Sequence, residues 1–533
     1  MIGRPRATVE ALPAYRPGRS AEQAAAEHGI AEAIKLASNE LPWGPLPSVR
    51  SALATATDDV HLYADHRSAR LRGELAQRHA LDPSRVMVGC GSAGLLQQLA
   101  LSYLDPGDRV VYGWPSFEAY PIFVQLAGAE ARPVELRRQT VVADALAEAV
   151  DERTKLVLLA NPNNPTGTAV GLDDVQRLLE ACPPTCLVVL DEAYREFVDH
   201  PALGDPIPLL DEYPHLVILR TFSKAHGLAG LRVGYGFAHT EVASEVDKTL
   251  LPFAVNGLGQ AAASASLAAN DEMTERVDQV VAERERVARA LRELGWSVPR
   301  SQANFVWLPA GAASADLGRE LEQAGYVTRA FPGVGVRVTV ADPETNDAFL
   351  AAFATVSSTI DPASWETPTG ELAARVQGAL DDLDAALARL EAHADGGRPD
   401  GLTEADEATG ERWEAAQVWA HLAEFGGYWL PQLRLIVDAG SDEPVPFGRT
   451  KRDPHRIAMI ERHRHDDVAE LVATVRADIA RFADELAQLA PEDWSQVGRH
   501  ETLGDLDLWQ FLDHFVTGHY HEHADQLDGL AGA

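Results

Sequence analysis

Two charged residues follow hydrophobic runs that are typical of buried strands. Lys224 comes directly after LVILRTFS (216–223), and Asp191 lies in CLVVLDEAY (186–194), at the end of its hydrophobic part. Glycine and alanine surround Lys224, and burial there would lower the pKa of the ammonium group and free the amine to attack carbonyl groups. A carboxylate at the carboxyl edge of a parallel sheet lies where α/β proteins bind ligands. The alternatives are a solvated loop lysine and an aspartate that caps the following turn.

Two nearby segments have the composition of a phosphate site. The pattern Gly-x-Gly-x-x-Gly at 89–94 lies between a predicted strand and a predicted helix, so backbone N–H groups there could bind a phosphate. The match to the dinucleotide-binding pattern is weak, because the only acidic residues nearby, Asp105 and Asp108, precede the next strand instead of ending it. Ser223 and Arg232 add a hydroxyl and a guanidinium group, and both are good phosphate ligands.

The elements that must position these residues alternate in character. The predicted strands are 85–89, 109–113, 155–160, 186–194 and 216–223, and the segments of helical period between them include 94–104 and 173–182. Strand–helix alternation predicts an α/β unit with a mostly parallel sheet.

A second unit begins after about residue 360. Residues 371–533 contain 33 Asp and Glu against 14 Lys and Arg, and they hold ten of the 18 histidines. The segment 358–370 has two prolines and few aliphatic residues, and we interpret it as a linker. Helical periodicity at 381–394, 415–430, 467–489 and 508–527 predicts a four-helix bundle, with 396–411 as a loop inside it.

Composition excludes several classes of function. The 533 residues carry a net charge of −34, which disfavours nucleic acid and anionic membranes as partners. We find no apolar run of about 18 residues and no apolar segment of signal-peptide type at the start. Three cysteines in so long a chain do not form a disulfide framework, so we expect a cytoplasmic protein.

Taken together, the motifs of the first unit resemble the fold-type-I pyridoxal-phosphate aminotransferases, in the branch of histidinol-phosphate and aromatic (phenylalanine) aminotransferases. The resemblance covers about residues 8–355. It is carried by KLASNELPWGP (35–45), YAD (63–65), GCGSAG (89–94), PSFEAY (115–120), NPNNPTG (161–167), DEAY (191–194), RTFSKAHGLAGLRVGY (220–235), SQANFVW (301–307) and GVRVTV (335–340). It implies a large, mixed, mostly parallel sheet flanked by helices, with a small α/β subdomain, over residues 1–357.

The resemblance assigns catalytic roles to Lys224, Asp191 and Tyr194. It implies that Lys224 holds pyridoxal 5′-phosphate as a Schiff base, and that Asp191 keeps the pyridine nitrogen protonated and strengthens the ring as an electron sink. The further cofactor contacts that it implies are Asn164 and Tyr194 on the phenolic oxygen, Phe117 on the ring face, and Ser92, Ala93, Ser223 and Arg232 on the phosphate.

The same resemblance implies a homodimer, because Tyr63 would reach the phosphate from the neighbouring subunit. On the substrate side it implies that Arg337 binds the α-carboxylate bidentately, with Asn39, Tyr15 and Arg329 nearby. Two departures from the family are His226, where Phe or Tyr is common, and Ser-Ala-Gly at 92–94, where an acidic residue is common. Neither removes a group that transamination needs.

The implied reaction is ping-pong transamination between an aromatic L-amino acid and a 2-oxo acid, because several motifs are closer to aromatic than to histidinol-phosphate aminotransferases. Histidinol-phosphate aminotransferase, in histidine biosynthesis, is the alternative. Arg329 does not separate them, since it could serve a substrate phosphate or the pocket rim. A related decarboxylase or lyase is a third possibility, against which Arg337 and the segment 161–167 count.

Three histidines of the second unit could hold a metal ion. His519 and His523 are four residues apart on one helix face, His421 lies on an earlier helix, and His521 points elsewhere. Three nitrogens from two helices can bind a metal with open positions for water or substrate. The alternative is a solvent-facing, histidine-rich acidic helix.

The second unit also resembles the DinB-like four-helix superfamily, over about residues 367–530. The matching motifs are WEAAQVWAHL (413–422) and His-x-x-x-His-x-x-Gln-Leu (519–527). This resemblance implies a divalent metal (Zn, Ni or Fe) in a bundle over residues 371–533. It adds a further alternative for the whole chain: a bifunctional protein, or a thiol-dependent metalloprotein or small-molecule sensor in which the second unit carries the function.

Overall fold

The computed structural model describes residues 4–10, 12, 19–358, 370–394, 401–405, 412–438, 444–450, 453–489 and 493–531. The chain forms two compact units that divide near residue 363, and each is described by itself. Only the two end residues of the predicted linker 358–370, and only 401–405 of the predicted loop 396–411, belong to the described part.

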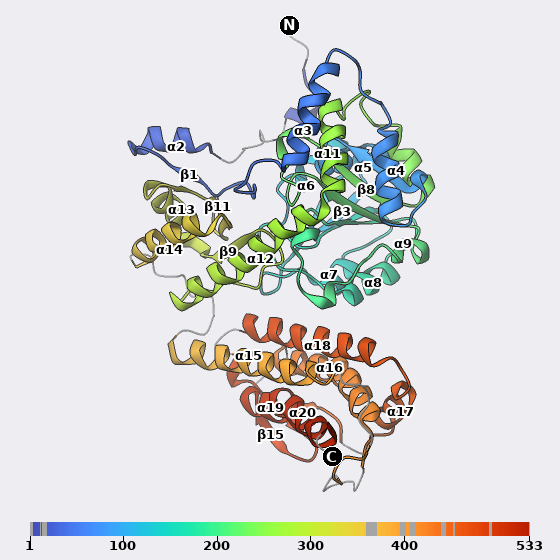
Figure 1. Ribbon diagram of the computed structural model, residues 1–533, viewed down its shortest axis with the longest axis vertical. Coiled ribbons are helices and arrows are strands. Elements are labelled where there is room, and N and C mark those ends of the chain that lie inside the picture. Colours follow the sequence, from blue (N-terminus) through green and yellow to red (C-terminus); the bar gives the residue numbers. More distant parts are fainter. Residues whose placement is uncertain are drawn as a thin grey trace. The chain divides into compact units, whose positions relative to one another are not determined.

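The first unit is built on a seven-stranded sheet with the strand order β2-β8-β7-β6-β5-β3-β4 (Figure 1). Neighbouring strands are parallel except at β8, which is antiparallel to both β2 and β7. The strands are β2 (Val86–Gly89), β3 (Arg109–Trp114), β4 (Glu130–Glu135), β5 (Thr154–Ala160), β6 (Leu187–Asp191), β7 (Leu216–Thr221) and β8 (Gly234–Ala238). The predicted mostly parallel sheet is confirmed.

Two strands of this sheet were not predicted. β4 lies at the sheet edge, is mostly exposed and contains Pro133, so it has no hydrophobic run. β8 is rich in glycine, and a Cβ on Gly234 would lie 2.1 Å from the backbone nitrogen of Ser92. Glycine is therefore required where β8 passes the start of α5 (Gly91–Tyr103), although it weakens the strand signal.

Both faces of the sheet are buried. Alternate strand residues belong to two separate apolar clusters, one with Val110, Leu156, Val189 and Val217 and the other with Val111, Val157, Val188 and Ile218. Because successive side chains point to opposite faces, a strand that is covered on both faces reads as an unbroken hydrophobic run. This explains why the central strands could be located from the sequence.

Helices cover the sheet and continue into the small subdomain (Figure 1). In addition to α5 they are α1 (Ala7–Glu10), α2 (Ala21–His28), α3 (Pro47–Ala56), α4 (Ala69–Arg78), α6 (Tyr120–Ala127), α7 (Ala143–Glu148), α8 (Leu172–Ala181), α9 (Leu209–Glu212), α10 (Thr240–Asp247), α11 (Gly257–Ala268), α12 (Asn270–Glu293), α13 (Ser314–Gln323) and α14 (Pro343–Ser357). In α8, Val175, Leu178 and Leu179 share the buried face. The predicted helices 94–104 and 173–182 correspond to α5 and α8.

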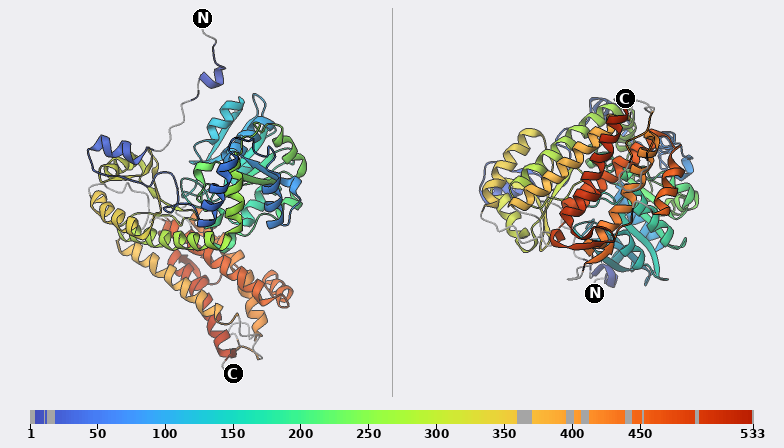
Figure 2. Two further views of the ribbon diagram at one scale, coloured as in Figure 1. Left: turned by 45° about the horizontal axis from the view of Figure 1, so that its top comes forward. Right: turned by 90° about the horizontal axis from the view of Figure 1, so that it is seen from below.

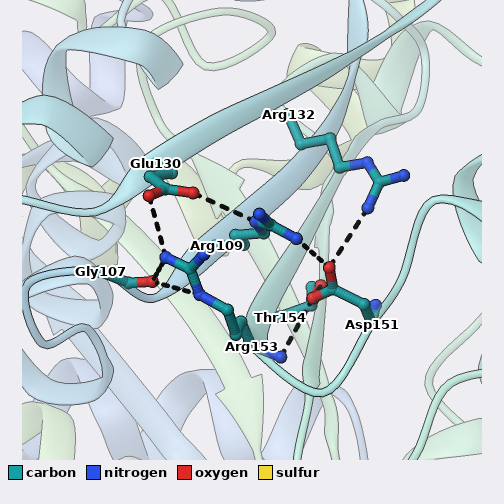
Figure 3. A network of polar contacts seen from close by, with 7 residues as sticks. All are labelled: Gly107, Arg109, Glu130, Arg132, Asp151, Arg153 and Thr154. Atoms are coloured by element: carbon teal, nitrogen blue, oxygen red, sulfur yellow. Dashed lines mark hydrogen bonds and ion pairs between the residues drawn. The ribbon is translucent and has the colours of Figure 1, made fainter.

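A polar network ties together the amino ends of β3, β4 and β5 (Figure 3). Arg109 donates to Glu130 at 3.1 Å and is paired with Asp151, while Arg153 donates to Glu130 and to the Gly107 carbonyl, both at 2.9 Å. These ion pairs lie at the strand starts, at the edge opposite the carboxyl ends that hold Asp191. They hold the amino ends of these strands together and leave the opposite edge of the sheet open for a ligand.

The predicted small α/β subdomain is also present. Its sheet has the order β11-β12-β9, all antiparallel, with β9 (Phe305–Pro309), β11 (Arg329–Phe331) and β12 (Gly335–Thr339). A second, parallel pair joins β1 (Ile34–Lys35) to β10 (Tyr326–Val327). This pair brings the N-terminal segment, including Asn39, beside β12, where the Asn39 N–H donates to Thr339 Oγ1 at 2.9 Å.

The second unit is the predicted four-helix bundle. Its long helices are α15 (Gly370–Glu391), α16 (Ala415–Asp438), α18 (Val468–Gln488) and α20 (Thr517–Ala531). α15 and α16 each pack against both α18 and α20, and Figure 2 shows these helices in the orange to red part of the chain. Their inward faces form a separate apolar core that includes Trp419, Phe482 and Tyr520.

Other elements of the second unit were not predicted. The segment 508–527 forms two helices, α19 (Leu508–Phe515) and α20, because the backbone at Val516 leaves the helical region with φ −135° and ψ −86°. Short elements add α17 (Pro454–His463) and a three-stranded sheet of β13 (Val445–Phe447), β14 (Val497–His500) and β15 (Gly504–Asp507). None of the helices in the described part of the chain is long and apolar enough to cross a membrane.

Candidate functional site

The first unit has a cavity of about 240 Å³ at the carboxyl ends of β5, β6 and β7 and the start of α5. Its wall contains most of the residues that the sequence singled out: Asn39, Ser92, Ala93, Phe117, Asn164, Asp191, Tyr194, Ser223, Lys224, Arg232, Arg329 and Arg337. Of the other two in the first unit, Tyr63 is not in this wall and Tyr15 is outside the described residues. The structure therefore brings residues from positions 39 to 337 into one site.

Lys224 lies half-buried in the wall, three residues after β7. Its Nζ donates to the carbonyl oxygens of Ser38 at 2.9 Å and Asn39 at 3.3 Å. Burial, together with the nearby Arg337 guanidinium, lowers the pKa of Lys224 to about 7. Near neutral pH a large fraction of this amine is unprotonated, which is the form that attacks carbonyl carbon.

Asp191 ends β6 and is only 5% exposed. The Tyr120 hydroxyl donates to its Oδ2 at 3.1 Å, whereas Oδ1 is buried and has no hydrogen-bond partner among the described residues. Burial raises the pKa of Asp191 to about 6, against the hydrogen bond from Tyr120, which favours the ionised form. A buried acceptor without a partner in a cavity wall is suited to a donor on a bound molecule.

The start of α5 and the loop before β8 together form an anion site. Arg232 Nη1 donates to Ser223 Oγ at 3.3 Å and to the Ala229 carbonyl at 3.0 Å. Gly91 has φ +74°, and a Cβ there would lie 2.5 Å from Arg232 Nη2. The glycine pattern thus lets a guanidinium group approach the start of α5. A guanidinium group and the first backbone N–H groups of a helix both favour a phosphate.

Tyr194 is held by the N-terminal segment. Its hydroxyl accepts a hydrogen bond from Asn39 Nδ2 at 2.9 Å, and the Asn39 carbonyl accepts one from Asn304 Nδ2 at 3.0 Å. Asn39 has φ +54°, a left-handed conformation that asparagine tolerates better than most residues. Lys224 Nζ lies 5.8 Å from the centre of the Tyr194 ring, so the phenol and the amine face the same space.

The segment 161–167 is a rigid loop whose asparagines have different tasks. The Asn161 side chain exchanges two hydrogen bonds with the Val170 backbone, at 3.0 and 2.9 Å. Asn163 accepts from Ser116 Oγ at 2.8 Å and donates to Thr166 at 2.9 Å. Asn164 instead lines the cavity, so the loop is both a structured turn and part of the site.

Two arginines of the small subdomain face each other across the β11–β12 pair and line the cavity. Arg337 donates to Asn164 Oδ1 and to the Ala37 carbonyl. Arg329 is paired with Glu118, since its Nη2 lies 2.8 Å from both carboxylate oxygens. One guanidinium is therefore neutralised by a carboxylate of the same chain, and the other is held by neutral oxygens.

One predicted site residue of the first unit, Tyr63, is not in this cavity wall. Tyr63 is 85% exposed and stacks on Phe253, with ring centres 4.5 Å apart. Val60, Leu62 and Leu251 are also exposed, so the first unit has an exposed group of large apolar side chains here. Tyr15 lies outside the described residues.

His226, a departure from the family pattern, is buried beneath the site and not in its wall. Its Nδ1 is 2.8 Å from Ser266 Oγ, and its ring packs on Phe222 at 4.6 Å. Burial lowers the pKa of His226 to about 3, so the ring is neutral near pH 7.

Two functional candidates were missed by the sequence reasoning, although both lie in PSFEAY (115–120). Tyr120 hydrogen-bonds Asp191, and Glu118 pairs with Arg329 in the cavity wall. Their position in this motif could have identified them as candidates from the sequence. Phe117, the one residue of the motif given a role, lies in the same wall with its ring centre 5.6 Å from that of Tyr120.

The three histidines of the second unit converge. His519 Nε2 is 3.0 Å from the Nε2 atoms of both His421 and His523. His421 and His523 are buried, and the His519 ring stacks on Phe425 at 3.8 Å, so these side chains are not on a solvent-facing helix surface. His521 points away, toward Asp382 at 3.0 Å, as its spacing predicted.

A glutamine side chain orients one of the rings in this cluster. His523 Nδ1 is 2.8 Å from Gln526 Oε1, whereas His421 Nδ1 is buried without a hydrogen-bond partner among the described residues and lies 4.0 Å from Glu424 Oε2. A partner on Nδ1 leaves the Nε2 lone pair directed at the cluster, which is how metal-binding histidines are usually held. Burial lowers the pKa of His421 well below its usual range, so it is neutral and available as a ligand.

Comparison with known proteins assigns the family. The profile of "Aminotransferase class I and II" matches residues 31–353, and that of the "DinB superfamily" matches 371–527. The aromatic amino acid aminotransferase of Thermobifida fusca is 50% identical over 345 residues, which are 65% of this chain and 95% of that protein. That of Mycobacterium tuberculosis is 47% identical over 352 residues, covering 66% of this chain and 97% of that protein.

A solved structure agrees with the sequence relatives. Histidinol-phosphate aminotransferase from Sinorhizobium meliloti, in complex with pyridoxal-5'-phosphate, matches with a TM-score of 0.63 and 30% identity. The match covers 68% of this chain and 99% of that one. The chain belongs to the class I and II aminotransferases, which are pyridoxal-phosphate-dependent enzymes of transamination, and it carries a DinB-like helical unit after that region.

The cavity fits pyridoxal 5′-phosphate in its chemistry. The cofactor has an aldehyde, a ring nitrogen that can carry a proton, and a phosphate. The cavity offers an amine of lowered pKa at Lys224, the unpartnered buried oxygen of Asp191, and the anion site of Arg232, Ser223 and the α5 start. Each group of the cofactor thus has a complementary group in the wall.

Proposed function

We propose that the first unit transfers the amino group of an aromatic L-amino acid to a 2-oxo acid. The observation that carries this proposal is the pairing, in one cavity, of a lysine whose pKa is lowered to about 7 with a buried aspartate oxygen that lacks a partner. Relatives that are 47–50% identical are named for aromatic amino acids, which supports the substrate class.

We assign the cofactor contacts as follows. Lys224 would hold pyridoxal 5′-phosphate covalently, and Asp191 Oδ1 would accept the hydrogen bond of its protonated ring nitrogen. Ser92, Ala93, Ser223 and Arg232 would bind its phosphate, Asn164 and Tyr194 its phenolic oxygen, and Phe117 its ring face. Bound there, the cofactor supplies an electron sink for the charge left on the substrate Cα.

Lys224 would also move the proton. As a free amine beside the substrate, Nζ would be a base near neutral pH, because its pKa is lowered. It would take the proton from the substrate Cα and later return it as an acid. Arg337 binds the substrate carboxylate, because its guanidinium lies in the same wall beside neutral oxygens. Asn39 holds the Tyr194 hydroxyl at the edge of this space.

The Glu118–Arg329 pair favours an aromatic amino acid over histidinol phosphate, the second candidate. Two facing arginines could together bind a phosphate dianion, but Glu118 already neutralises Arg329. A phosphate there would also face the Glu118 carboxylate, and like charges repel. The remaining guanidinium, Arg337, matches the single carboxylate of an amino acid.

We further propose a homodimer in which Tyr63 completes the phosphate site of the partner subunit. Tyr63 is exposed and does not line the cavity of its own subunit, and the apolar residues Val60, Leu62, Leu251 and Phe253 are exposed as well. An exposed apolar group of this kind is typical of a subunit interface. We retain the proposal of a cytoplasmic location, since all three cysteines are free thiols.

For the second unit we propose a divalent metal (Zn, Ni or Fe) on His421, His519 and His523. Three imidazoles with converging Nε2 atoms are a common ligand set for such ions, and three protein ligands leave positions for other ligands. We also propose that residues 1–357 and 371–533 are separate domains joined by 358–370. The separate apolar core of the second unit supports this division.

A half-reaction screen tests the aromatic specificity. Protein carrying pyridoxal 5′-phosphate is mixed with one amino donor at a time, without an acceptor, and the released 2-oxo product is quantified over time. We expect fast, stoichiometric release from phenylalanine and tyrosine, and release at least about tenfold slower from histidinol phosphate. The reverse order would replace the proposal by the histidinol-phosphate alternative.

A further inference from the structure

The second unit contains a pocket that extends beyond the histidine cluster. Its volume is about 690 Å³, within the range of about 300–1,000 Å³ that is usual for small-molecule sites. Its wall includes His421 and His519 of the cluster, the rings of Phe425, Trp429 and Phe515, and the Arg449 side chain. All of these residues belong to the second unit.

Stacked aromatic rings form one side of this pocket. Trp429 stacks on Phe515 with ring centres 4.1 Å apart, and Phe425 stacks on His519 at 3.8 Å. Such paired rings are rigid and offer a flat apolar surface. This side suits an aromatic or branched aliphatic body.

Arg449 forms the polar side of the pocket. Its side chain is only 7% exposed, and its guanidinium lies 3.9 Å above the Tyr428 ring. Nη2 donates to Glu424 at 2.5 Å, but Nη1 is buried without a hydrogen-bond partner among the described residues. A buried guanidinium donor left unpaired is costly, and an acceptor on a ligand would remove that cost.

The charges around the pocket favour an anion over a cation. Residues 371–533 carry 33 acidic against 14 basic side chains, yet the pocket wall holds two arginines with buried side chains, Arg449 and Arg456. Among the described residues of that wall the one carboxylate, Glu522, is exposed. A guanidinium group binds an anionic acceptor more strongly than a neutral one, and Arg449 Nη1 is the donor that the described residues leave for such an acceptor.

We propose that this pocket binds a monocarboxylate with an aromatic or branched apolar body. Its carboxylate accepts from Arg449 Nη1, and its body lies against Phe425, Trp429 and Phe515, beside the histidine cluster. The 2-oxo acid released by transamination belongs to this chemical class, and this last connection alone rests on the proposed function of the first unit.

Calorimetric titration of the full chain tests the proposal. The titration uses an Arg337→Met variant, so that acid binding in the first unit is weakened and the second unit is observed. The probes are 3-phenylpropionate, phenylpyruvate and the uncharged 3-phenylpropanol. We expect both acids to bind at about one per chain, and the alcohol at least about tenfold more weakly, because it lacks the charge that Arg449 recognises.

Substitution of Arg449 supplies the second arm. Adding Arg449→Met to the Arg337→Met variant is expected to weaken acid binding at least about tenfold. A further variant adds Glu424→Gln to Arg449→Met, so that the Glu424 carboxylate is not left buried without its arginine partner. We expect this variant to lose acid binding to the same extent. The control is Arg476→Met, because Arg476 forms an exposed ion pair with Glu391 and does not line the pocket.

Two results would overturn the proposal: equal affinity for the alcohol and the acids, or unchanged acid binding after the loss of Arg449. The comparison of alcohol with acid leaves the second unit unaltered, so it decides even where the Arg449 variants do not fold. Binding of 3-phenylpropionate but not phenylpyruvate would remove the connection to transamination. If the first unit does not bind acids through Arg337, the unaltered protein and the Arg337→Met variant bind the same number of acid molecules per chain. That result would contradict the proposed function of the first unit and leave the proposal for this pocket standing.

Discussion

Glu118 holds the Arg329 guanidinium in a bidentate ion pair, with Arg329 Nη2 2.8 Å from both carboxylate oxygens. Arg329 lies directly opposite Arg337 in the β11–β12 pair. Of the two guanidinium groups in the cavity wall, that of Arg329 therefore has its charge offset by a carboxylate. Under the proposed function, this ion pair disfavours a substrate phosphate at Arg329, which the two arginines alone would not do.

Removing the Glu118 charge should relax this selectivity. We expect Glu118→Gln to raise kcat/KM for histidinol phosphate relative to phenylalanine by about tenfold, because Arg329 becomes available to a phosphate. Steady-state kinetics with both donors measures the ratio. Glu344→Gln, at an exposed position of α14, is the matched control. An unchanged ratio in Glu118→Gln would show that the pair plays no part in selectivity.

We expect the buried Asp191 carboxylate to lower the stability of the folded protein and to be necessary for the reaction. Its pKa is about 6 in the folded protein and lower in the unfolded chain. The free energy of unfolding therefore falls as the pH rises between these two pKa values, and it remains lowered at higher pH. We expect Asp191→Asn to raise the free energy of unfolding of the cofactor-free protein at pH 7 by about 1–3 kcal/mol. Turnover should fall by about 10²–10³-fold or more.

Denaturant unfolding and steady-state kinetics check the two halves of that prediction, with Asp59→Asn as an exposed control. A variant that is less stable, or one with normal turnover, would contradict the view that burial of this carboxylate serves the ring nitrogen.

The rate at which cofactor-free protein captures pyridoxal 5′-phosphate should depend on pH through Lys224. Its pKa is lowered to about 7, so the reactive neutral amine increases up to this pH and is nearly complete about one unit above it. We expect the capture rate to rise from pH 5 to 7 and to level off above about 8. An ordinary lysine would instead give a rise that continues to about pH 10.

Rapid-mixing absorbance measurements give this profile. Because Arg337 contributes to lowering the Lys224 pKa, Arg337→Met should move the midpoint to higher pH. A midpoint near 10 in the unaltered protein would show that Lys224 is solvated.

Metal content tests the histidine cluster of the second unit. We expect about one divalent ion per chain in the purified protein, and less than about a tenth of that in His519→Ala, since two of three nitrogens hold such ions poorly. Elemental analysis measures both. His521→Ala is a matched control two residues away, because His521 faces Asp382. Equal metal content in the two variants, or no metal in the unaltered protein, would reject the site.

Residues in local strand-to-loop motifs could be located from the sequence. Asp191 and Lys224 follow hydrophobic runs that are buried on both sheet faces, and this burial is a strong signal. The Glu118–Arg329 pair could not be predicted in this way, because the residues are 211 positions apart and meet only when the small subdomain packs beside the cavity.

In the second unit, helical periodicity located the bundle but not its details. The break at Val516 lies inside a segment that is periodic on both sides. The short strands β13, β14 and β15 have no long hydrophobic runs, and their pairing depends on contacts between distant segments. The convergence of His421 with His519 and His523 was predictable in part, because the last two share a helix face.

The sharpest test of the proposed function is whether the cofactor attaches covalently to Lys224. Protein incubated with pyridoxal 5′-phosphate is reduced with borohydride, digested and analysed by mass spectrometry, with Lys224→Ala and the exposed Lys248→Ala in parallel. We expect the added mass on the peptide that contains Lys224, its retention in Lys248→Ala, and its loss, together with all turnover, in Lys224→Ala. Stable modification of another lysine with Lys224 unmodified, or full turnover in Lys224→Ala, would contradict it.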